Sequence, residues 1–235
     1  MLPLAERLRP KTLNEYIGQQ HLIGEGAILR QMLDRGTLSS FILWGPPGVG
    51  KTTLARIIAR QLDRPFYTLS AVTSGVKDVR DVIDKAKRHA VSNSGLFGSS
   101  LDNEGPRDRR AVLFIDEIHR FSKSQQDSLL GAVEDGTITL IGATTENPSF
   151  EVITPLLSRC QVYVLKSLTK DDLLQLLDRV MKEDEYIRSL NVEIKETDSI
   201  LRYSGGDARK LLNIIELVTN SGVKVIDNDT VTKQL

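Results

Sequence analysis

Residues 41–52 read Phe-Ile-Leu-Trp-Gly-Pro-Pro-Gly-Val-Gly-Lys-Thr, a short apolar run followed by a complete GxxxxGK[ST] pattern. Glycines in such a loop let the backbone wrap a phosphate group, and the N–H groups that open the next helix face the anion. Lys51 is predicted to reach the β- and γ-phosphates, and the Thr52 hydroxyl to bind Mg²⁺. The stretch therefore predicts a strand, a phosphate-binding loop (P-loop) and a helix. A chance glycine loop is the alternative, and the flanking elements argue against it.

The sequence on both sides of the P-loop extends this α/β pattern. Apolar runs alternate with helical periods as far as residue 166, which is typical of a parallel sheet built from βαβ units. The five expected strands are Phe41–Trp44, Phe66–Leu69, Val112–Ile115, Ile138–Ala143 and Val162–Leu165. Ser122 with Gln125, and Thr169 with Asp172, have the spacing of helix-capping pairs. We expect a five-stranded parallel sheet flanked by helices over residues 1–166 and a small all-helical subdomain over residues 167–235.

The composition excludes several classes of protein. The 235 residues include 31 Lys and Arg and 31 Asp and Glu, so binding to DNA or to an anionic membrane would need a local patch. The longest apolar run, Ala111–Ile115, is far too short to cross a bilayer, which predicts a cytoplasmic protein with no membrane partner. One cysteine and three scattered histidines exclude a disulfide framework and zinc-ligand spacing, so any metal is predicted to be an oxygen-bound cation. Residues 92–106 are rich in turn formers and predict a surface excursion.

An acidic pair follows one of the apolar runs, since residues 112–117 read Val-Leu-Phe-Ile-Asp-Glu. Because neighbouring strand residues point to opposite sides, Asp116 is predicted to bind Mg²⁺ while Glu117 faces the γ-phosphate and polarises the attacking water. The alternative is a solvated acidic turn. His119 is predicted to be a packed, hydrogen-bonded residue rather than a base, because Glu117 already fills that role.

Polar side chains also stand at the ends of later elements. The run ending at Ala143 leads into Thr-Thr-Glu-Asn-Pro, so Thr145 or Asn147 is expected to hydrogen-bond the γ-phosphate or the water, with plain turn chemistry as the alternative. Arg159 and Arg209 each lie near an element boundary. An arginine in such a place stabilises charge on a transferred phosphoryl group, or is simply a surface residue.

The order of these motifs resembles the AAA+ ATPases of the clamp-loader clade. More narrowly, five strings are similar to the RarA/MgsA family, whose eukaryotic relative is the Werner helicase-interacting ATPase. They are Pro-Leu-Ala-Glu-Arg-Leu-Arg-Pro (3–10), Ile-Gly-Gln-Gln-His-Leu (17–22), Asp-Glu-Ile-His-Arg-Phe (116–121), Ser-Gln-Gln-Asp (124–127) and Gly-Ala-Thr-Thr-Glu-Asn-Pro-Ser-Phe (142–150). The resemblance covers nearly the whole chain and implies an AAA+ core, with the sheet subdomain followed by a helical lid.

The resemblance also implies roles for single residues. Thr145 would be sensor 1, with Asn147 the less favoured candidate, Arg159 would be the arginine finger that acts on the neighbouring subunit, and Arg209 would be sensor 2. The implied catalytic residues are Glu117, Lys51, Arg159, Thr145 and Arg209, and the implied metal ligands are Thr52 and Asp116. The segment around Tyr16 would seat the adenine, so the implied nucleotide contacts are Tyr16, Ile17, Gly18, Pro46, Pro47, Gly48, Val49, Gly50, Lys51, Thr52, Thr53, Asn147 and Arg209.

The partners implied by the resemblance are ATP, Mg²⁺, DNA and further copies of the chain. Family members are homotetrameric, DNA-stimulated ATPases at stalled or gapped replication forks, where they meet replication or repair proteins and, in bacteria, the nucleoid. We expect this sequence to be the AAA+ core without the family's C-terminal oligomerisation domain. Alternatives are a clamp-loader subunit, a branch-migration motor, or an ATP-gated binding module with little turnover.

The expected DNA contacts are Thr73, Ser74 and Lys77. In clamp-loader relatives the loop and helix start after the second strand face a central channel, and hydroxyls, a helix N-terminus and one positive charge suit the phosphate backbone. No base-reading motif is present, so DNA is expected to be recognised by its structure and backbone. The basic run at 107–110 is interpreted as a solvated charge run.

Overall fold

The computed structural model of the protein describes residues 2–93 and 110–235. Most of the predicted excursion at 92–106, together with Arg107 and Arg109, lies outside the described residues. The chain divides into two compact units. Unit 1 contains Met1–Gln19, Pro46–Thr53 and Lys166–Leu235, and unit 2 contains Gln20–Gly45 and Leu54–Leu165. The predicted subdomain boundary after residue 166 stays a prediction.

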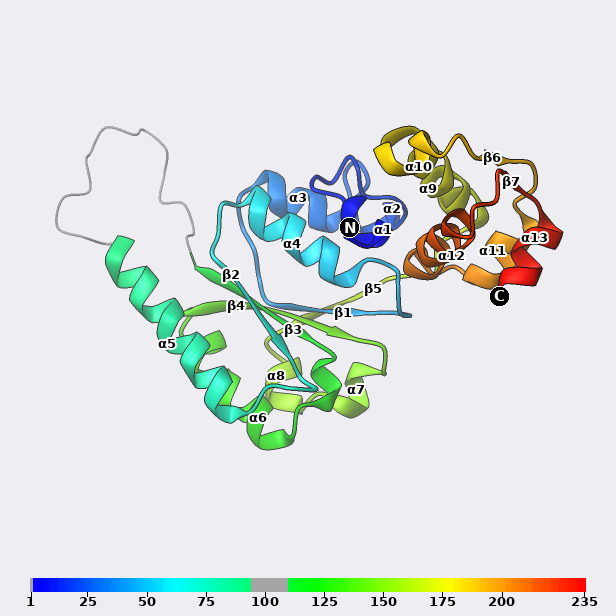
Figure 1. Ribbon diagram of the computed structural model, residues 1–235. Helices are drawn as coiled ribbons and strands as arrows, with labels where there is room; N and C mark the ends of the chain where they lie inside the picture. Colours follow the sequence, from blue (N-terminus) through cyan, green and yellow to red (C-terminus); the bar gives the residue numbers. More distant parts are fainter. Residues whose placement is uncertain (1, 94–109) are drawn as a thin grey trace, which may run out of the picture. The chain divides into compact units, whose positions relative to one another are not determined.

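Unit 2 is built on a five-stranded parallel sheet with the strand order β2-β3-β4-β1-β5 (Figure 1). The strands are β1 (Phe41–Trp44), β2 (Phe66–Ser70), β3 (Ala111–Asp116), β4 (Ile138–Thr144) and β5 (Gln161–Val164). The predicted sheet is confirmed, and each strand lies within one residue of its predicted bounds. Residues of β4 are buried along the whole strand, because a central parallel strand is covered on both faces.

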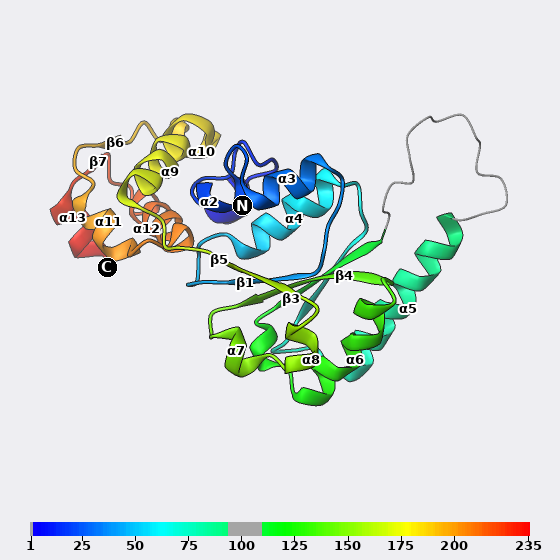
Figure 2. The same ribbon diagram turned by 180° about the vertical axis from the view of Figure 1, so that it is seen from behind.

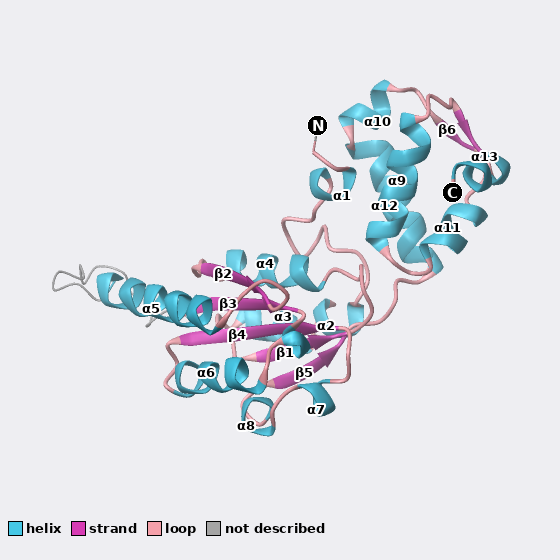
Figure 3. Ribbon diagram, turned by 60° about the horizontal axis from the view of Figure 1, so that its bottom comes forward, coloured by secondary structure: helices cyan, strands magenta, loops and turns pink. Residues whose placement is uncertain are grey.

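Helices cover both faces of this sheet (Figures 1 and 2). One face carries α5 (Val76–Asn93), α6 (Lys123–Glu134), α7 (Pro148–Glu151) and α8 (Thr154–Leu157). The other face carries α3 (Ile28–Asp34) and α4 (Lys51–Gln61), as Figure 3 also shows. Two short elements, α2 (Gln20–Ile23) and η1 (Ile118–Arg120), complete the unit.

The core of unit 2 joins the helices to the sheet. One cluster of buried side chains packs α5, α6 and α8 on the strands, with members Val79, Ile83, Leu129, Leu156, Ile42, Leu113, Ile115 and Leu140. The start of α6 is fixed by the predicted capping pair, because Gln125 donates its backbone N–H to Ser122 Oγ at 3.3 Å and accepts from the Ser122 N–H at 2.8 Å. The capping pair predicted at Thr169 and Asp172 likewise opens a helix, α9.

Unit 1 combines the N-terminal and P-loop segments with the C-terminal helices. Its helices are α1 (Leu4–Arg7), α9 (Lys170–Glu183), α10 (Glu185–Ser189), α11 (Asp198–Ser204), α12 (Ala208–Asn220) and α13 (Asn228–Gln234). The prediction that residues 167–235 are all helical is incomplete, since β6 (Glu193–Ile194) and β7 (Val225–Ile226) form a parallel pair. Each strand has only two residues, too few for an alternating pattern to appear in the sequence.

An ion-pair cluster fastens the N-terminal segment to the helices of unit 1. The Arg7 guanidinium donates to Asp184 at 2.7 Å and to Glu216 at 3.2 Å. Asp184 is only 4% exposed, and burial alone would raise the pKa of its carboxyl. The hydrogen bonds from Arg7 and from the Ile187 N–H outweigh burial and hold this pKa below its ordinary value.

The helices that the structure describes include none with the length and apolar content needed to span a bilayer.

Candidate nucleotide site

The P-loop leaves the carboxyl end of β1. Its first residue, Gly45, donates its N–H to Thr144 O at 3.1 Å, which fixes the start of the loop beside the end of β4. Lys51 is the first residue of α4, is 7% exposed, and donates from Nζ to Pro46 O at 2.9 Å. The predicted strand, loop and helix around the GxxxxGK[ST] pattern are therefore present in the expected order.

Two P-loop glycines have positive φ angles and close neighbours. Gly48 has φ +69°, and a Cβ added there would lie 1.8 Å from Asp207 Oδ1. Gly50 has φ +96°, and a Cβ added there would lie 2.5 Å from the Tyr16 hydroxyl oxygen. Only glycine fits both the backbone conformation and the space at these positions. Tyr16 and Asp207, both in unit 1, thus lie directly against the loop.

Hydrogen bonds from outside the loop reach two P-loop carbonyls and one P-loop side chain. Tyr16 donates its hydroxyl to Val49 O at 2.9 Å, and Ala208, at the start of α12, donates its N–H to Gly48 O at 3.2 Å. Arg9 donates from Nη1 to Thr53 Oγ1 at 3.0 Å. Tyr16 therefore contacts the P-loop with its hydroxyl, and its role at the adenine stays a prediction.

The neighbours of Tyr16 lie against the segment that leads into α9. A Cβ added at Gly18 would come 2.7 Å from the Leu168 side chain, and Ile17 packs on the apolar core of the C-terminal helices. Gln19 forms a two-way bridge to Lys166, donating to its carbonyl at 2.7 Å and accepting from its N–H at 2.9 Å. The predicted adenine segment is thus fixed at both ends within unit 1.

Arg209, the predicted sensor 2 residue, lies in the first turn of α12 and is exposed. The N-cap of this helix is Asp207, whose carboxylate accepts the Lys210 N–H at 2.9 Å. Arg209 directly follows Ala208, which is bonded to the P-loop. Its position therefore fits a contact to a nucleotide held by the P-loop of the same unit.

The acidic pair in unit 2 has a geometry that the strand pattern did not predict. Asp116 is the last residue of β3, whereas Glu117 adopts a left-handed conformation with φ 53° and ψ 47°. Glu117 has therefore left the extended conformation in which strand alternation would set the direction of its side chain. A non-glycine residue in this conformation costs about 1–2 kcal/mol, and such strain is concentrated at functional sites.

Two side chains contact the Glu117 carboxylate at this edge of the sheet, and a third contacts one of these two. Thr145 donates to Glu117 Oε2 at 3.4 Å, and His119 Nδ1 lies 3.2 Å from the same oxygen and 2.9 Å from Thr144 Oγ1. The prediction of a packed, hydrogen-bonded His119 agrees with its 12% exposure. Thr144 also contacts Gly45, so one network joins Glu117 to the first residue of the P-loop.

Asn147 and Arg159 are both engaged within unit 2. The Asn147 amide oxygen accepts the Ser149 N–H at 3.0 Å and caps α7, which is the turn role considered as the alternative. The exposed Arg159 pairs with Glu134 and donates to Pro155 O at 2.6 Å and to Ser158 Oγ at 3.2 Å. Its role as an arginine finger and that of Asn147 as a nucleotide contact stay predictions.

The predicted DNA contacts surround the start of α5. Thr73 and Lys77 are exposed and Ser74 is half-buried, but Asp78 accepts the Gly75 N–H at 2.7 Å. This carboxylate caps the helix and adds a negative charge, so the helix N-terminus contributes less to anion binding than expected. The hydroxyls and Lys77 are the remaining donors toward a phosphate backbone.

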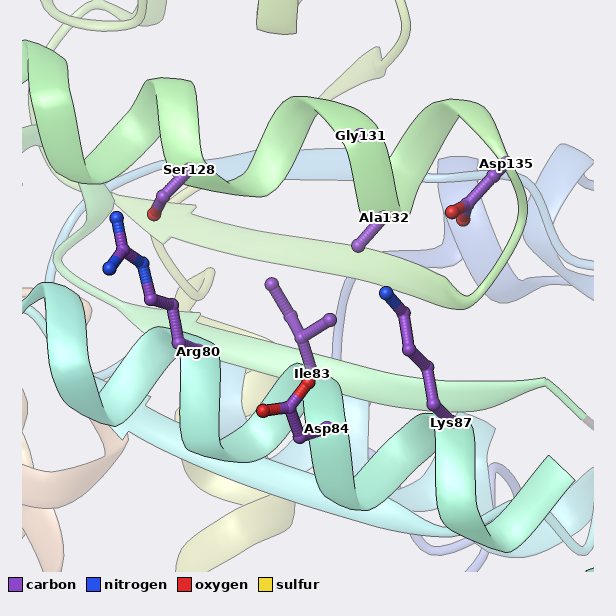
Figure 4. Close-up of a pocket in the computed structure, with 8 residues that line it drawn as sticks. All are labelled: Arg80, Ile83, Asp84, Lys87, Ser128, Gly131, Ala132 and Asp135. Atoms are coloured by element: carbon purple, nitrogen blue, oxygen red, sulfur yellow. The ribbon is translucent and has the colours of Figure 1, made fainter. Parts of the chain in front are cut away.

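A separate hollow of about 320 Å³ lies between α5 and α6 (Figure 4). Its walls carry Arg80 and Lys87 on one helix and Asp135 beyond the end of the other. None of the predicted site residues lines it. The charges are mixed, and Asp135 is already bonded to the Thr137 N–H at 2.8 Å, so this hollow is not assigned a ligand.

The predicted metal ligands are oxygen donors, the Thr52 hydroxyl of unit 1 and the Asp116 carboxylate of unit 2. Mg²⁺ prefers such hard ligands and keeps water and phosphate oxygens in its remaining positions. Among the described residues, no group of three or more His, Cys, Asp or Glu side chains could hold a metal by itself. Thr52 and Asp116 each offer an oxygen donor of the kind that Mg²⁺ prefers, and their role as metal ligands stays a prediction.

Comparison with known proteins places the chain. The family model described as ATPase family associated with various cellular activities (AAA) matches residues 41–168. The chain belongs to the AAA ATPase family. This confirms the predicted fold class and the prediction of an ATPase. Nucleotide binding is accordingly a property of the family to which the chain belongs.

Three relatives refine this placement. Over all of its length the chain is 44% identical to replication-associated recombination protein A of Coxiella burnetii, of which it covers 51%. It is 46% identical to the Escherichia coli K12 protein of the same name, over 98% of the chain and 50% of that protein. It is 44% identical to ATPase WRNIP1 of Dictyostelium discoideum, over 92% of the chain and 23% of that protein. The predicted resemblance to the RarA/MgsA AAA+ core is confirmed, and the chain spans about half the length of the bacterial relatives.

Solved structures give the same result. The Thermotoga maritima RuvB Holliday junction branch migration motor is 31% identical to the chain and superimposes with a TM-score of 0.71, over 97% of the chain and 72% of RuvB.

Sequence reasoning missed three residues of this site. Arg9 contacts Thr53, Asp207 lies against Gly48, and Thr144 links His119 to Gly45. Arg9 and Asp207 lie inside strings already quoted from the sequence, but their contacts join segments far apart in the chain. No local pattern reports such contacts.

Proposed function

We propose that the chain is the ATP-hydrolysing core of a DNA-stimulated ATPase that acts on stalled or gapped replication forks in recombination and repair. The observation that carries the proposal is the network from Gly45 through Thr144 and His119 to Glu117. It ties the start of the P-loop to a fixed carboxylate at the same edge of the sheet. A protein that only binds ATP has little use for a positioned base.

Glu117 is the general base in this proposal. Thr145 and His119 both contact Oε2, so we assign Oε1 to the attacking water. Water polarised by a carboxylate attacks the γ-phosphorus, and the bond to the β-phosphate oxygen breaks to give ADP and inorganic phosphate. A positioned base of this kind contributes about 10²–10⁴ in rate.

The remaining residues bind and neutralise the triphosphate. Lys51 exchanges its bond to Pro46 O for the β- and γ-phosphates, and Arg209 contacts the γ-phosphate from α12. Thr52 and Asp116 would hold Mg²⁺, which would supply charge neutralisation on the phosphate oxygens. Tyr16, Ile17 and Gly18 form the segment assigned to the adenosine end.

The proposed partners are DNA and further copies of the chain. The names of the relatives, replication-associated recombination protein A and RuvB branch migration motor, support a DNA substrate for the proposed activity. Arg159 is proposed to act on ATP held by a neighbouring copy in a homo-oligomer, a tetramer in the full-length protein. Replication or repair proteins and a cytoplasmic, nucleoid-associated location follow from the same proposal.

ATP turnover per subunit, measured against protein concentration with and without single-stranded or gapped DNA, tests the proposal. We expect turnover to rise with both variables. Glu117→Gln should retain ATP affinity within about twofold and lose about 10²-fold or more of turnover. Glu146→Gln, a change of the same type at an exposed glutamate nearby, is the control and should leave turnover unchanged. Turnover that survives Glu117→Gln would refute the assignment of the base.

A branch-migration motor is the second candidate, because the likeness to RuvB extends over 97% of the chain. If gapped or forked DNA stimulates ATP turnover more than a four-way junction does, the activity at replication forks is favoured. A preference for the four-way junction, with movement of its branch point, favours the motor.

A further inference from the structure

Two successive peptide groups of the P-loop are hydrogen-bonded from outside the loop on their carbonyl side. Ala208 donates to Gly48 O at 3.2 Å and Tyr16 donates to Val49 O at 2.9 Å. A peptide group joins the carbonyl of one residue to the N–H of the next. The two bonds therefore act on the groups that carry the Val49 and Gly50 N–H donors, which face a phosphate in a P-loop.

The Tyr16 contact is built into the packing. Tyr16 is 5% exposed, its hydroxyl lies where a Gly50 side chain would otherwise be, and Val49 is 3% exposed. Burial raises the pKa of the phenol, so Tyr16 stays protonated and donates at neutral pH. The hydroxyl therefore donates to the loop backbone and is shielded from solvent.

We propose that the Tyr16 hydroxyl and the Ala208 N–H position the phosphate-binding amides of the P-loop from behind. Hydrogen bonds in a chain polarise one another, so a carbonyl that accepts a bond has a more strongly donating N–H at the other end of its peptide group. The two contacts also hold the amides in the binding orientation before the nucleotide arrives. Tyr16 is thus a positioning residue for phosphates through its hydroxyl, in addition to its proposed place in the segment at the adenosine end. This inference rests on the proposed ATP site.

ADP and adenosine differ only in the phosphate groups, so comparing their affinities separates a role of Tyr16 in phosphate binding from a role in stabilising the fold. Tyr16→Phe keeps the ring and leaves Val49 O without its donor. We expect the Kd for ADP to rise about tenfold, equivalent to about 1.4 kcal/mol, and the Kd for adenosine to stay within about twofold. Calorimetric titration of the chain with each ligand measures both constants. ADP lacks the γ-phosphate, so the result is independent of Arg209.

A second variant tests the other bond. Ala208→Pro removes the N–H that reaches Gly48 O, and proline is tolerated at the first position of a helix. The preceding Asp207 has φ −104° and ψ 113°, a conformation that suits a residue before proline. We expect a selective loss of ADP affinity here as well, by about three- to tenfold. If Tyr16→Phe does not fold, the ADP affinity of Ala208→Pro tests the proposal by itself.

Tyr163→Phe is the matched control, because it deletes a hydroxyl that donates to Gln161 Oε1 at 2.8 Å, in unit 2. It should change neither constant. Unchanged ADP affinity in both test variants, or equal losses for ADP and adenosine, would overturn the inference. A wild-type chain that binds neither ADP nor ATP would instead overturn the proposed function on which it rests.

Discussion

The P-loop of unit 1 and the acidic pair of unit 2 are held in different ways. The loop binds phosphate with backbone N–H groups, and the groups that hold it contact its carbonyls, its glycines and Thr53. Glu117 works with a side chain, and neighbouring side chains from η1 and the end of β4 hold its carboxylate. Backbone N–H groups bind a ligand only if the backbone itself is held in place. A carboxylate acts as a base only if its side chain is held in one rotamer.

The conformational cost is also distributed differently. Positive φ angles in the P-loop fall on glycines, which adopt them without steric cost. The positive φ at the acidic pair falls on Glu117, which does not. The loop is therefore expected to tolerate no added side chain, and the acidic pair to gain stability when its glutamate is removed.

The largest predicted effect concerns the side chains of unit 2. Arg159→Ala should lower turnover by about 10³-fold or more with ADP affinity unchanged, because an arginine finger acts on the transition state alone. Phosphate release and ADP titration measure the two quantities. Mixing this variant with Lys51→Ala should restore part of the turnover if Arg159 acts on a neighbouring copy.

The control for that experiment is Arg188→Ala, which removes an exposed arginine of unit 1. It should leave turnover unchanged. Full turnover by Arg159→Ala, or no complementation at concentrations where subunits associate, would contradict a finger that acts between copies.

The next effect concerns the ion-pair cluster of Arg7, Asp184 and Glu216 in unit 1. Arg7→Gln removes the bonds to Asp184 and Glu216 and should lower the free energy of unfolding at pH 7 by about 2–3 kcal/mol. The pKa of the Asp184 carboxyl is lowered in the folded state. Its stabilising contribution is therefore complete above the ordinary aspartate pKa of about 3.9 and is lost as the pH falls further.

The difference in stability between wild type and Arg7→Gln should accordingly shrink below about pH 4. Urea unfolding of both proteins at neutral and acidic pH tests this. A difference that stays constant over that range would show that Arg7 stabilises by packing and not through the Asp184 pair.

The smallest effect sharpens the contrast in backbone strain. Glu117→Gly and Glu117→Ala both remove the carboxylate and should both stop turnover. The glycine variant should nevertheless be more stable by about 0.5–1 kcal/mol, because only glycine occupies the left-handed region freely. Chemical denaturation of the pair measures the difference, and equal stabilities would mean that the turn relaxes once the carboxylate is gone.

Much of the fold could be predicted from the sequence, because its signals are local. Apolar runs such as Ala111–Ile115 show a buried parallel strand, and the capping pairs at Ser122 and Thr169 act over three residues. The P-loop could be predicted for the same reason. The two-residue strands β6 and β7 could not, because so short a pairing is decided by tertiary packing.

The supports of the site could not be predicted, because they depend on the fold. Tyr16 lies 33 positions before Val49, and Ala208 reaches Gly48 from the far end of the chain. The left-handed turn at Glu117 goes against the residue's own preference, so the sequence pattern indicated strand alternation instead. The DNA contacts expected at the start of α5 did not take account of Asp78, whose carboxylate accepts the Gly75 N–H.

The strand order has a consequence for how the chain is made. Within the described part of the chain, strand β1 pairs only with β4 and β5, and Ile138, the first residue of β4, follows Trp44 by 94 positions. At a synthesis rate of about 5–20 residues per second, the apolar β1 waits on the ribosome for roughly 5–20 s before either partner emerges. The nascent chain therefore carries an unpaired, aggregation-prone strand while those 94 residues are made, and the strand that leads into the P-loop is made early and buried late.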